Sequence, residues 1–390
     1  MQLSATYPGL RVLDLATNFA GPYAAMILGD MGADVIKVER PPTGDDTRSL
    51  PPQAGGMATV FSAVNRNKRS IVIDYRDPAD REILFKLVET ADVLIESFPP
   101  GFAEKRGLAF TDFAARNPAL IGVSVSAFGD GPLGQTMPGY DALVQAVSGL
   151  MSFTGNKGDA TVRIAPSVLD LTTGMWAAMG VMAALERRRV SGKGEHLHPA
   201  LIDTAFNVMN HQLLAFFATG REPEKLGAGA PSAAPYGVYR ANDGELLIAT
   251  ASDAQFPRLC EVLGLDAQGV DPSLAGMEQR IARREEIDRL IAAKIATRGV
   301  AEWLADLEKA RISCGRVNSV SEAIHLPVVE ERALFTQLPD TPVIQIHLPV
   351  DEGRDSVMRP PPGLDAHRAE ILAELAIRNT RGNGCSWSSQ

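Results

Sequence analysis

The chain has 390 residues, a formal net charge of −9 and a hydrophobic fraction of 45%. This length exceeds what one hydrophobic core usually organises, so two domains are expected. The negative charge argues against a general nucleic-acid binder, although a local basic cluster can still bind a small phosphorylated ligand. No run of about 18 apolar residues and no secretory signal is visible, so we expect no membrane partner and a cytoplasmic location.

The first 130 residues alternate between short apolar runs and helical patterns. The expected strands are 12–15, 34–38, 93–95 and 120–126, with helices expected at 22–31 and 80–90. Continuous apolar strands alternating with helices are typical of a parallel sheet covered on both faces. We therefore predict an α/β fold with a large, Rossmann-like, parallel-sheet domain.

The later part of the chain has a different character. A helix over 170–189 is rich in small residues, which should let another backbone approach closely, and a second helix is expected over 199–217. The segment 225–235, dominated by Gly, Ala and Pro, is interpreted as a linker or an active-site cover. The Asp-Gly turn within 241–244 predicts a β-hairpin, and charged helices follow at 276–298 and 300–310.

These patterns predict three parts of the chain. Residues 1–225 form a large domain that binds the ligand, and residues 226–325 form a smaller α+β domain. Residues 326–390 form a linker and a C-terminal return to the large domain, with a strand at 343–348 and a helix at 364–378, although the pattern alone leaves the packing of this tail open. Residues 382–390 are expected to be disordered.

Cysteine and histidine give little sign of a metal site. Cys260, Cys314 and Cys385 lie far apart, so neither a disulfide framework nor a zinc site is expected. His196 and His198 form the one close histidine pair of the sequence, and a surface turn is favoured over metal binding. We predict no metal and no tightly bound cofactor.

A GxGxxG pattern occurs between Gly129 and Gly134. The dinucleotide-binding fingerprint needs a helix that starts directly after these glycines and holds the pyrophosphate at its N-terminus. Pro132 and the residues after Gly134 do not start such a helix. An ordinary turn is therefore favoured over an NAD site.

Two other regions could bind an anion. The loop 18–22 starts a helix, where free N–H groups favour an anion, and an ordinary turn capped by Asn18 is an equally good interpretation. Arg40 ends the second strand, at the sheet edge where ligands gather, and further cations occur at 66–69 and 105–106. These cations suit phosphate groups, although a solvated surface is favoured from the residues alone.

Asp170 stands where the small-residue helix begins. An N-cap is the plain interpretation. The same place suits a nucleophile, because a helix N-terminus favours the ionised carboxylate that attacks a thioester carbonyl. Asp141 and Asp203 are rival carboxylates.

The order of these motifs resembles CoA-transferase family III, the group that contains formyl-CoA transferase and carnitine CoA-transferase. The resemblance covers essentially the whole chain and is carried by the segments 11–15, 20–22, 32–40, 67–71, 91–98, 139–141, 170–175 and 191–194. It implies an enzyme that moves coenzyme A from an acyl-CoA donor to a carboxylic acid acceptor. It also implies a ring-shaped protomer, two of which interlock into a homodimer.

The resemblance also implies roles for individual residues. Asp170 matches the catalytic aspartate, which forms an aspartyl-CoA thioester by way of an acyl anhydride. Arg40 matches the arginine at the nucleotide end of CoA, and Phe19 and Ala20 match the loop along the pantetheine. Tyr140 matches a position of the family that lies at the substrate. The other implied CoA contacts are Ile73, Ser97, Lys105 and Arg106, and Gly227 and Gly229 match the glycine-rich cover over the nucleophile.

Departures from the family pattern bear on the substrate. Phe19 stands where formyl-CoA transferases carry glutamine, and the cover loop lacks their run of consecutive glycines, so formate and oxalate are not expected. The segment 231–239 is more similar to members that act on C4–C5 dicarboxylates such as succinate, mesaconate, itaconate or citramalate.

Two other functions compete with CoA transfer. An α-methylacyl-CoA racemase would carry histidine in place of Tyr140, and a tyrosine with a pKa of ~10 is a poor general base at neutral pH. In a non-catalytic CoA-binding protein, Asp170 would only cap its helix. The transferase is the favoured function.

Overall fold

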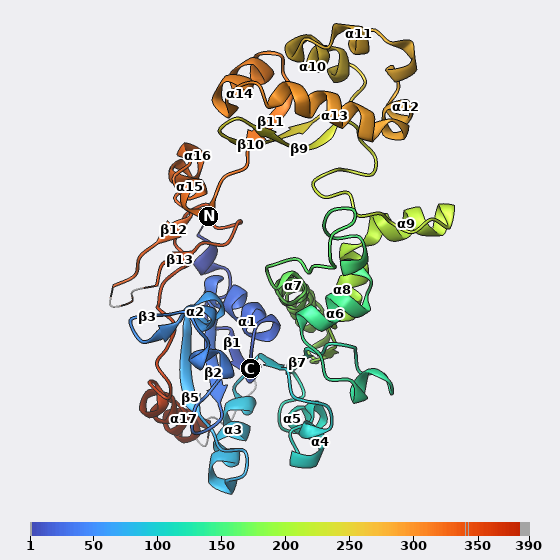
Figure 1. Cartoon of the computed structure of the whole chain (residues 1–390). Helices are drawn as coiled ribbons and strands as arrows, with labels where there is room; N and C mark the ends of the chain where they lie inside the picture. Colours follow the sequence, from blue (N-terminus) through green and yellow to red (C-terminus); the bar gives the residue numbers. More distant parts are fainter. Residues whose placement is uncertain (1, 340, 342, 383–390) are drawn as a thin grey trace. The chain divides into compact units, whose positions relative to one another are not determined.

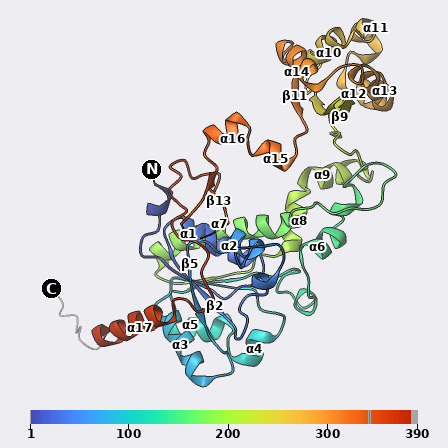
Figure 2. The same cartoon turned by 60° about the vertical axis from the view of Figure 1, so that its left-hand side comes forward.

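The computed structural model describes residues 2–339, 341 and 343–382. Of the residues 382–390 that were expected to be disordered, Gly382 ends a helix, and the others lie outside the described range. The chain divides into two compact units (Figures 1 and 2). Unit 1 contains the chain up to Ser148, Ala165–Leu213 and the chain from Arg332 onward. Unit 2 contains Gly149–Ile164 and Leu214–Glu331. The segment 149–164, which the sequence analysis assigns to the large domain, belongs to unit 2 because it is hydrogen-bonded to the loop around Gly227.

Unit 1 is built on a six-stranded parallel sheet with the strand order β5-β2-β1-β6-β7-β8. Its strands are β1 (Arg11–Asp14), β2 (Asp34–Glu39), β5 (Lys68–Val72), β6 (Val93–Glu96), β7 (Ile121–Ser124) and β8 (His196–Leu197). The predicted parallel sheet is confirmed. The sequence analysis missed β5, which begins with two cations, and β8, which is only two residues long.

Helices cover both faces of this sheet. On one face, α3 (Pro78–Glu89), α5 (Phe110–Arg116) and α17 (Arg368–Gly382) share a core with β1 and β2, in which Leu84, Phe113 and Ile371 pack with Leu13 and Ile36. The opposite face carries α1 (Ala20–Asp30), and α7 (Val168–Ser191) packs on α1. The placement of α17 shows that the C-terminal segment returns to unit 1.

The predicted close approach of a small-residue helix is confirmed between α7 and α1. A Cβ atom at Gly174 of α7 would lie 2.6 Å from the carbonyl oxygen of Ala20, so only glycine fits at this position. Among the described residues, α7 is the one helix with the length and mean hydropathy of a membrane span, by composition only. Its packing against α1 accounts for its small apolar face as part of the core of unit 1.

The remaining elements of unit 1 are short. They are α2 (Thr59–Asn65), α4 (Phe102–Arg106), α6 (Asp141–Val147), α8 (Leu201–Val208), the hairpin β3 (Gln53–Ala54) and β4 (Met57–Ala58), and the pair β12 (Phe335–Thr336) and β13 (Gln345–Ile346). Helix α9 (Asn210–Thr219) follows α8 after a break at Met209, where the sequence analysis expected one continuous helix.

Unit 2 is an α+β unit around a three-stranded antiparallel sheet, ordered β11-β10-β9. Its elements are β9 (Tyr236–Ala241), β10 (Gly244–Ala249), α10 (Gln255–Leu263), α11 (Asp266–Gly269), α12 (Met277–Ala282), α13 (Arg284–Ile295), α14 (Val300–Lys309), β11 (Ser313–Arg316), α15 (Val320–Ala323) and α16 (Pro327–Glu331). The β9–β10 hairpin confirms the prediction from the Asp-Gly turn. The helix expected over 276–298 is interrupted at Arg283.

The cations at 66–69 are not on a solvated surface, and they do not face a phosphate site, so both interpretations from the sequence are wrong for them. Lys68 is fully buried and its Nζ lies 2.7 Å from Oδ2 of Asp14. Arg66 pairs with Asp30 at 2.6 Å, and Arg69 pairs with Asp34 at 2.7 Å. Buried charges persist when they are paired, and each of these cations has a carboxylate partner within unit 1.

Candidate active site

A cavity of about 1240 Å³ opens in unit 1 beside the carboxyl ends of β1, β2, β6 and β7. Ligands of open α/β sheets gather at this edge. The lining includes several residues predicted from the sequence: Phe19, Ala20, Arg40, Ser97, Lys105, Tyr140 and Asp170. The loops after four separate strands and the start of α7 therefore bring these residues to one space.

The remaining predicted residues lie elsewhere. The side chain of Ile73 is fully buried in the core beneath the sheet and does not line the cavity. Arg106 lines a neighbouring cavity. Gly227 and Gly229 belong to unit 2, where the N–H of Gly227 donates to the carbonyl of Gly155 at 2.9 Å. Their role as a cover stays a prediction.

Asp170 lies in the first turn of α7 but does not cap the helix. The N-cap residue is Ser167, whose side chain makes no capping hydrogen bond, so the interpretation of Asp170 as the N-cap is wrong. The capping group comes from α6 instead. Oδ2 of Asp141 accepts hydrogen bonds from the backbone N–H groups of Leu169, at 2.7 Å, and Asp170, at 3.2 Å.

The carboxylate of Asp170 is poorly solvated. Burial and the nearby charge of Asp141 raise the pKa of Asp170 from 3.8 to about 7. Within the described residues no hydrogen bond to this carboxylate is seen, so its oxygens are available to a substrate in the cavity. A nucleophile with a pKa near neutrality combines a substantial ionised fraction with high basicity.

Buried charges hold the loop that follows β1. Nζ of Lys37, which is fully buried, donates to the carbonyl of Ala16 at 2.9 Å and lies 2.9 Å from Oδ2 of Asp45. The N–H of Thr17 donates to Oγ of Ser97 at 3.0 Å. Asn18 has a positive φ of 67° and does not cap α1, whose N-cap residue is Phe19. Phe19 and Ala20 are therefore positioned by contacts to β2 and to the end of β6.

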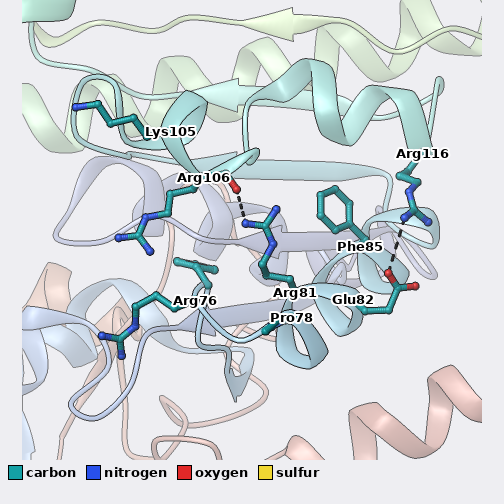
Figure 3. Close-up of a pocket in the computed structure, with 9 residues that line it drawn as sticks. Arg76, Pro78, Arg81, Glu82, Phe85, Lys105, Arg106 and Arg116 are labelled. Carbon is teal, nitrogen blue, oxygen red and sulfur yellow. Dashed lines mark hydrogen bonds and ion pairs between the residues drawn. The ribbon is translucent and has the colours of Figure 1, made fainter.

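A second, basic cavity of about 500 Å³ adjoins the first, and Tyr75 and Lys105 line both. Figure 3 shows its cations, which come from α3, α4, α5 and the segment after β5: Arg76, Arg81, Lys105, Arg106 and Arg116. Arg81 donates to the backbone carbonyl of Arg106. This excess of positive charge suits phosphate groups.

Sequence reasoning missed the histidines of the large cavity. His196 and His198 line it from β8 and the segment after it. The interpretation as a surface turn is wrong for His196, which is half-buried in β8, whereas His198 is exposed. Nε2 of His196 lies 2.8 Å from Oγ of Ser124, and burial lowers the pKa of His196 to about 4. No sequence signal could have located this pair, because its place depends on β8 joining the sheet beside β7. The described part of the chain holds no metal-binding cluster of His, Cys, Asp and Glu.

The glycine pattern at 129–134 is a turn, as predicted. Gly129 has a φ of 86°, and Gly134 begins a short 3-10 helix rather than an α-helix. The turn has no helix N-terminus for a pyrophosphate.

Comparison with known proteins decides the family. A sequence model of CoA-transferase family III matches residues 7–368. The chain belongs to this family. It is 37% identical to the succinate–glutarate CoA-transferase of Agrobacterium fabrum over 385 residues. The matched region covers 94% of this chain and 95% of the relative. It is also 36% identical over 344 residues to the acetyl-CoA:oxalate CoA-transferase of Acetobacter aceti, a match over 86% of this chain and 88% of that relative.

A solved structure agrees with this assignment. The crystal structure of a CAIB/BAIF family protein from Brucella suis matches with a TM-score of 0.85 and 34% identity, over 94% of this chain and 98% of that one. The resemblance inferred from the motifs is confirmed. This family III member is an enzyme that transfers CoA from an acyl-CoA to a carboxylic acid.

Proposed function

We propose that the enzyme transfers CoA from an acyl-CoA donor to a C4–C5 dicarboxylic acid through an aspartyl-CoA thioester on Asp170. The observation that carries the proposal is the carboxylate of Asp170, part-buried in the large cavity with a pKa of about 7. The relative from Agrobacterium fabrum is named for succinate and glutarate, which supports an acceptor of four or five carbons. The relative from Acetobacter aceti is named for oxalate, so that acid belongs in the assay as well.

The proposed reaction needs no oxidant and no metal step. An oxygen of the Asp170 carboxylate attacks the thioester carbonyl, the C–S bond breaks, and CoA leaves as thiolate from a mixed anhydride. The thiolate attacks the Asp170 carbonyl carbon and releases the donor acid as a carboxylate, which leaves the aspartyl-CoA thioester. The acceptor carboxylate then attacks this thioester, and the same two steps in reverse yield acceptor acyl-CoA and free Asp170.

The chain's own groups support these steps in different ways. Part-burial keeps water scarce around Asp170, which protects the anhydride and the thioester from hydrolysis. In this proposal Arg40, Lys105 and Arg106 offer positive charge to the phosphates of CoA. Phe19 and Ala20, which line the same cavity as Asp170, would contact the pantetheine. In this proposal Tyr140 contacts the substrate, and the loop with Gly227 and Gly229 closes over the thioester.

A panel assay tests the proposed function. Succinyl-CoA, acetyl-CoA and oxalyl-CoA are each offered with succinate, glutarate, mesaconate, oxalate and formate, and new acyl-CoA products are measured by mass spectrometry. We expect the highest kcat/KM with a C4–C5 dicarboxylate pair. The same assay in deuterated water, with an α-methylacyl-CoA added to the donors, tests the racemase. Incorporation of α-deuterium into this compound without acyl exchange would contradict CoA transfer. His196, with a pKa of about 4, is a weak base for such a proton transfer.

Removal of the Arg40 side chain is expected to weaken CoA binding. Arg40 lines the cavity at the end of β2, and it pairs with Asp46 on an exposed part of the surface. Arg40→Ala should cost about 1.5–3 kcal/mol in calorimetry with CoA, the range of a hydrogen bond to a charged group. Arg187→Ala is the matched control, because Arg187 forms an exposed pair with Glu195 and does not line the cavity. Equal CoA affinity in both variants would remove Arg40 from the site.

We also propose that the enzyme is a homodimer of interlocked, ring-shaped protomers. Large apolar side chains of α6, α7 and α8 remain exposed in unit 1: Leu143, Val147, Met175, Trp176, Met179 and Phe206. An exposed apolar face of this kind is typical of a protein–protein interface. Interlocked protomers cannot separate without unfolding, so sedimentation at nanomolar concentration should show only dimer. A folded monomer in that experiment would contradict the interlocked assembly.

A further inference from the structure

Asp141 is hydrogen-bonded to the first turn of α7, and its exposed fraction is 4%. It starts α6, and its Oδ1 accepts a hydrogen bond from the side chain of Gln145. Its Oδ2 accepts the N–H groups of Leu169 and Asp170. Both carboxylate oxygens are therefore held, and the carboxylate is fixed with respect to the backbone of Asp170.

These contacts change the electrostatics of the helix terminus. The free N–H groups at the start of a helix normally attract a carboxylate and favour its ionised form. In α7, two of these N–H groups already point at the carboxylate of Asp141. Asp170 therefore lies beside a helix terminus whose positive end is neutralised, and beside a second negative charge.

We propose that Asp141 is a positioning residue for the nucleophile: it fixes the first turn of α7 and cancels the attraction of that helix terminus for the Asp170 carboxylate. This inference rests on the proposed role of Asp170. A carboxylate that the helix does not stabilise is a stronger nucleophile toward a thioester, because nucleophilicity rises with basicity. The direction of the pKa of Asp170, raised by burial and then by Asp141, agrees with this geometry.

Other charged groups do not account for the effect. The elements packed against α7 are α1, α6, α8, β7 and β8. The titratable groups that they carry are Tyr23, Asp30, Asp141, His196 and Asp203. Of these, only Asp141 contributes to the raised pKa of Asp170.

The test compares Asp141→Asn with Asp141→Ala over pH. Asparagine keeps an oxygen that accepts the two N–H groups but removes the charge, so the acidic limb of kcat/KM should move down by about 1 pH unit. The plateau rate should fall about threefold, as expected for a Brønsted slope near 0.5. Asp141→Ala also removes the acceptor, so it should lose more activity than Asp141→Asn and melt at a lower temperature.

A spectroscopic titration separates this inference from the role of Asp170 itself. The carboxyl signal of Asp170 is obtained from ¹³C-aspartate spectra as the difference between wild type and Asp170→Asn, and its midpoint should fall in Asp141→Asn. Asp203→Asn is the control, because Asp203 is exposed on α8 and does not line the cavity. An unchanged midpoint and an unchanged acidic limb in Asp141→Asn would overturn the proposal, even if Asp170→Asn is inactive. Full activity of Asp170→Asn would instead overturn the proposed function.

Discussion

Asp170→Asn is expected to abolish CoA transfer and to raise the melting temperature. The variant lacks the proposed nucleophile, and loss of a covalent catalytic group lowers kcat by a factor of at least ~10⁴. The gain in stability follows from the raised pKa of Asp170, since an ionised carboxylate that is buried beside Asp141 costs folding free energy that a neutral amide does not. In the proposed mechanism, the stability lost at this position serves the nucleophile.

The pH dependence of the melting temperature tests this explanation. The pKa of Asp170 is about 7 in the folded protein and 3.8 in the unfolded chain. Between these two pH values the folded state therefore keeps a proton that the unfolded state has lost. The stability contributed by the neutral form is full below 3.8 and is lost as the pH rises through 7. The difference in melting temperature between Asp170→Asn and wild type should therefore be largest above pH 7 and should vanish near pH 3.8. A constant advantage at every pH would contradict this assignment of the pKa.

Chemical trapping tests whether Asp170 forms the proposed covalent intermediate. Wild type is incubated with an acyl-CoA and then with hydroxylamine or borohydride, and mass spectrometry should locate a modification at Asp170. Asp170→Asn should carry none, and Asp170→Ala guards against recovery of the aspartate by deamidation. Activity that persists in the alanine variant, or an adduct on another carboxylate, would show that the proposed mechanism is wrong.

The fold of unit 1 was predictable where the chain follows simple patterns. The apolar strands β1, β2, β6 and β7 and the hairpin of unit 2 agree with their sequence patterns. Strand β5 was not predictable from the sequence, because Lys68 and Arg69 resemble surface residues until their partners Asp14 and Asp34 are known. A sequence pattern gives the side-chain charge but not the buried partner that neutralises it.

The site was predictable only in part. Asp170 and Arg40 follow from strand ends, a helix start and the family motifs. The contact from Asp141 to the backbone of α7 joins residues 28 and 29 positions apart, and the approach of His196 to Ser124 joins residues 72 positions apart. Periodicity in the sequence does not predict contacts between residues so far apart, so these parts of the site emerge only from the folded chain.

Lys37→Met is expected to destabilise unit 1 more than any surface substitution. Nζ of Lys37 lies 2.9 Å from Asp45 and 3.6 Å from Asp14, and none of the three side chains is exposed. Burial acts to lower the pKa of Lys37, but the attraction of these carboxylates is stronger and raises the pKa to about 12. Methionine fills the volume but leaves Asp45 charged and unpaired, which costs about 3–5 kcal/mol for a broken buried ion pair. The carbonyl of Ala16 also loses its donor, so the loop with Phe19 should loosen.

Hydrogen exchange followed by mass spectrometry measures this effect unit by unit. Protection of β1 and β2 should fall in Lys37→Met while β9 and β10 of unit 2 keep theirs. Lys157→Met is the control, because Lys157 and Glu285 form an exposed pair in unit 2, and such pairs contribute about 0–1 kcal/mol. The double variant Lys37→Met with Asp45→Asn removes one charge of each sign and leaves Asp14 paired with Lys68. It should recover much of the lost protection, since the cost comes from an uncompensated carboxylate and not from lost volume. Equal loss in the single and double variants would show that packing, and not charge, holds this part of the site.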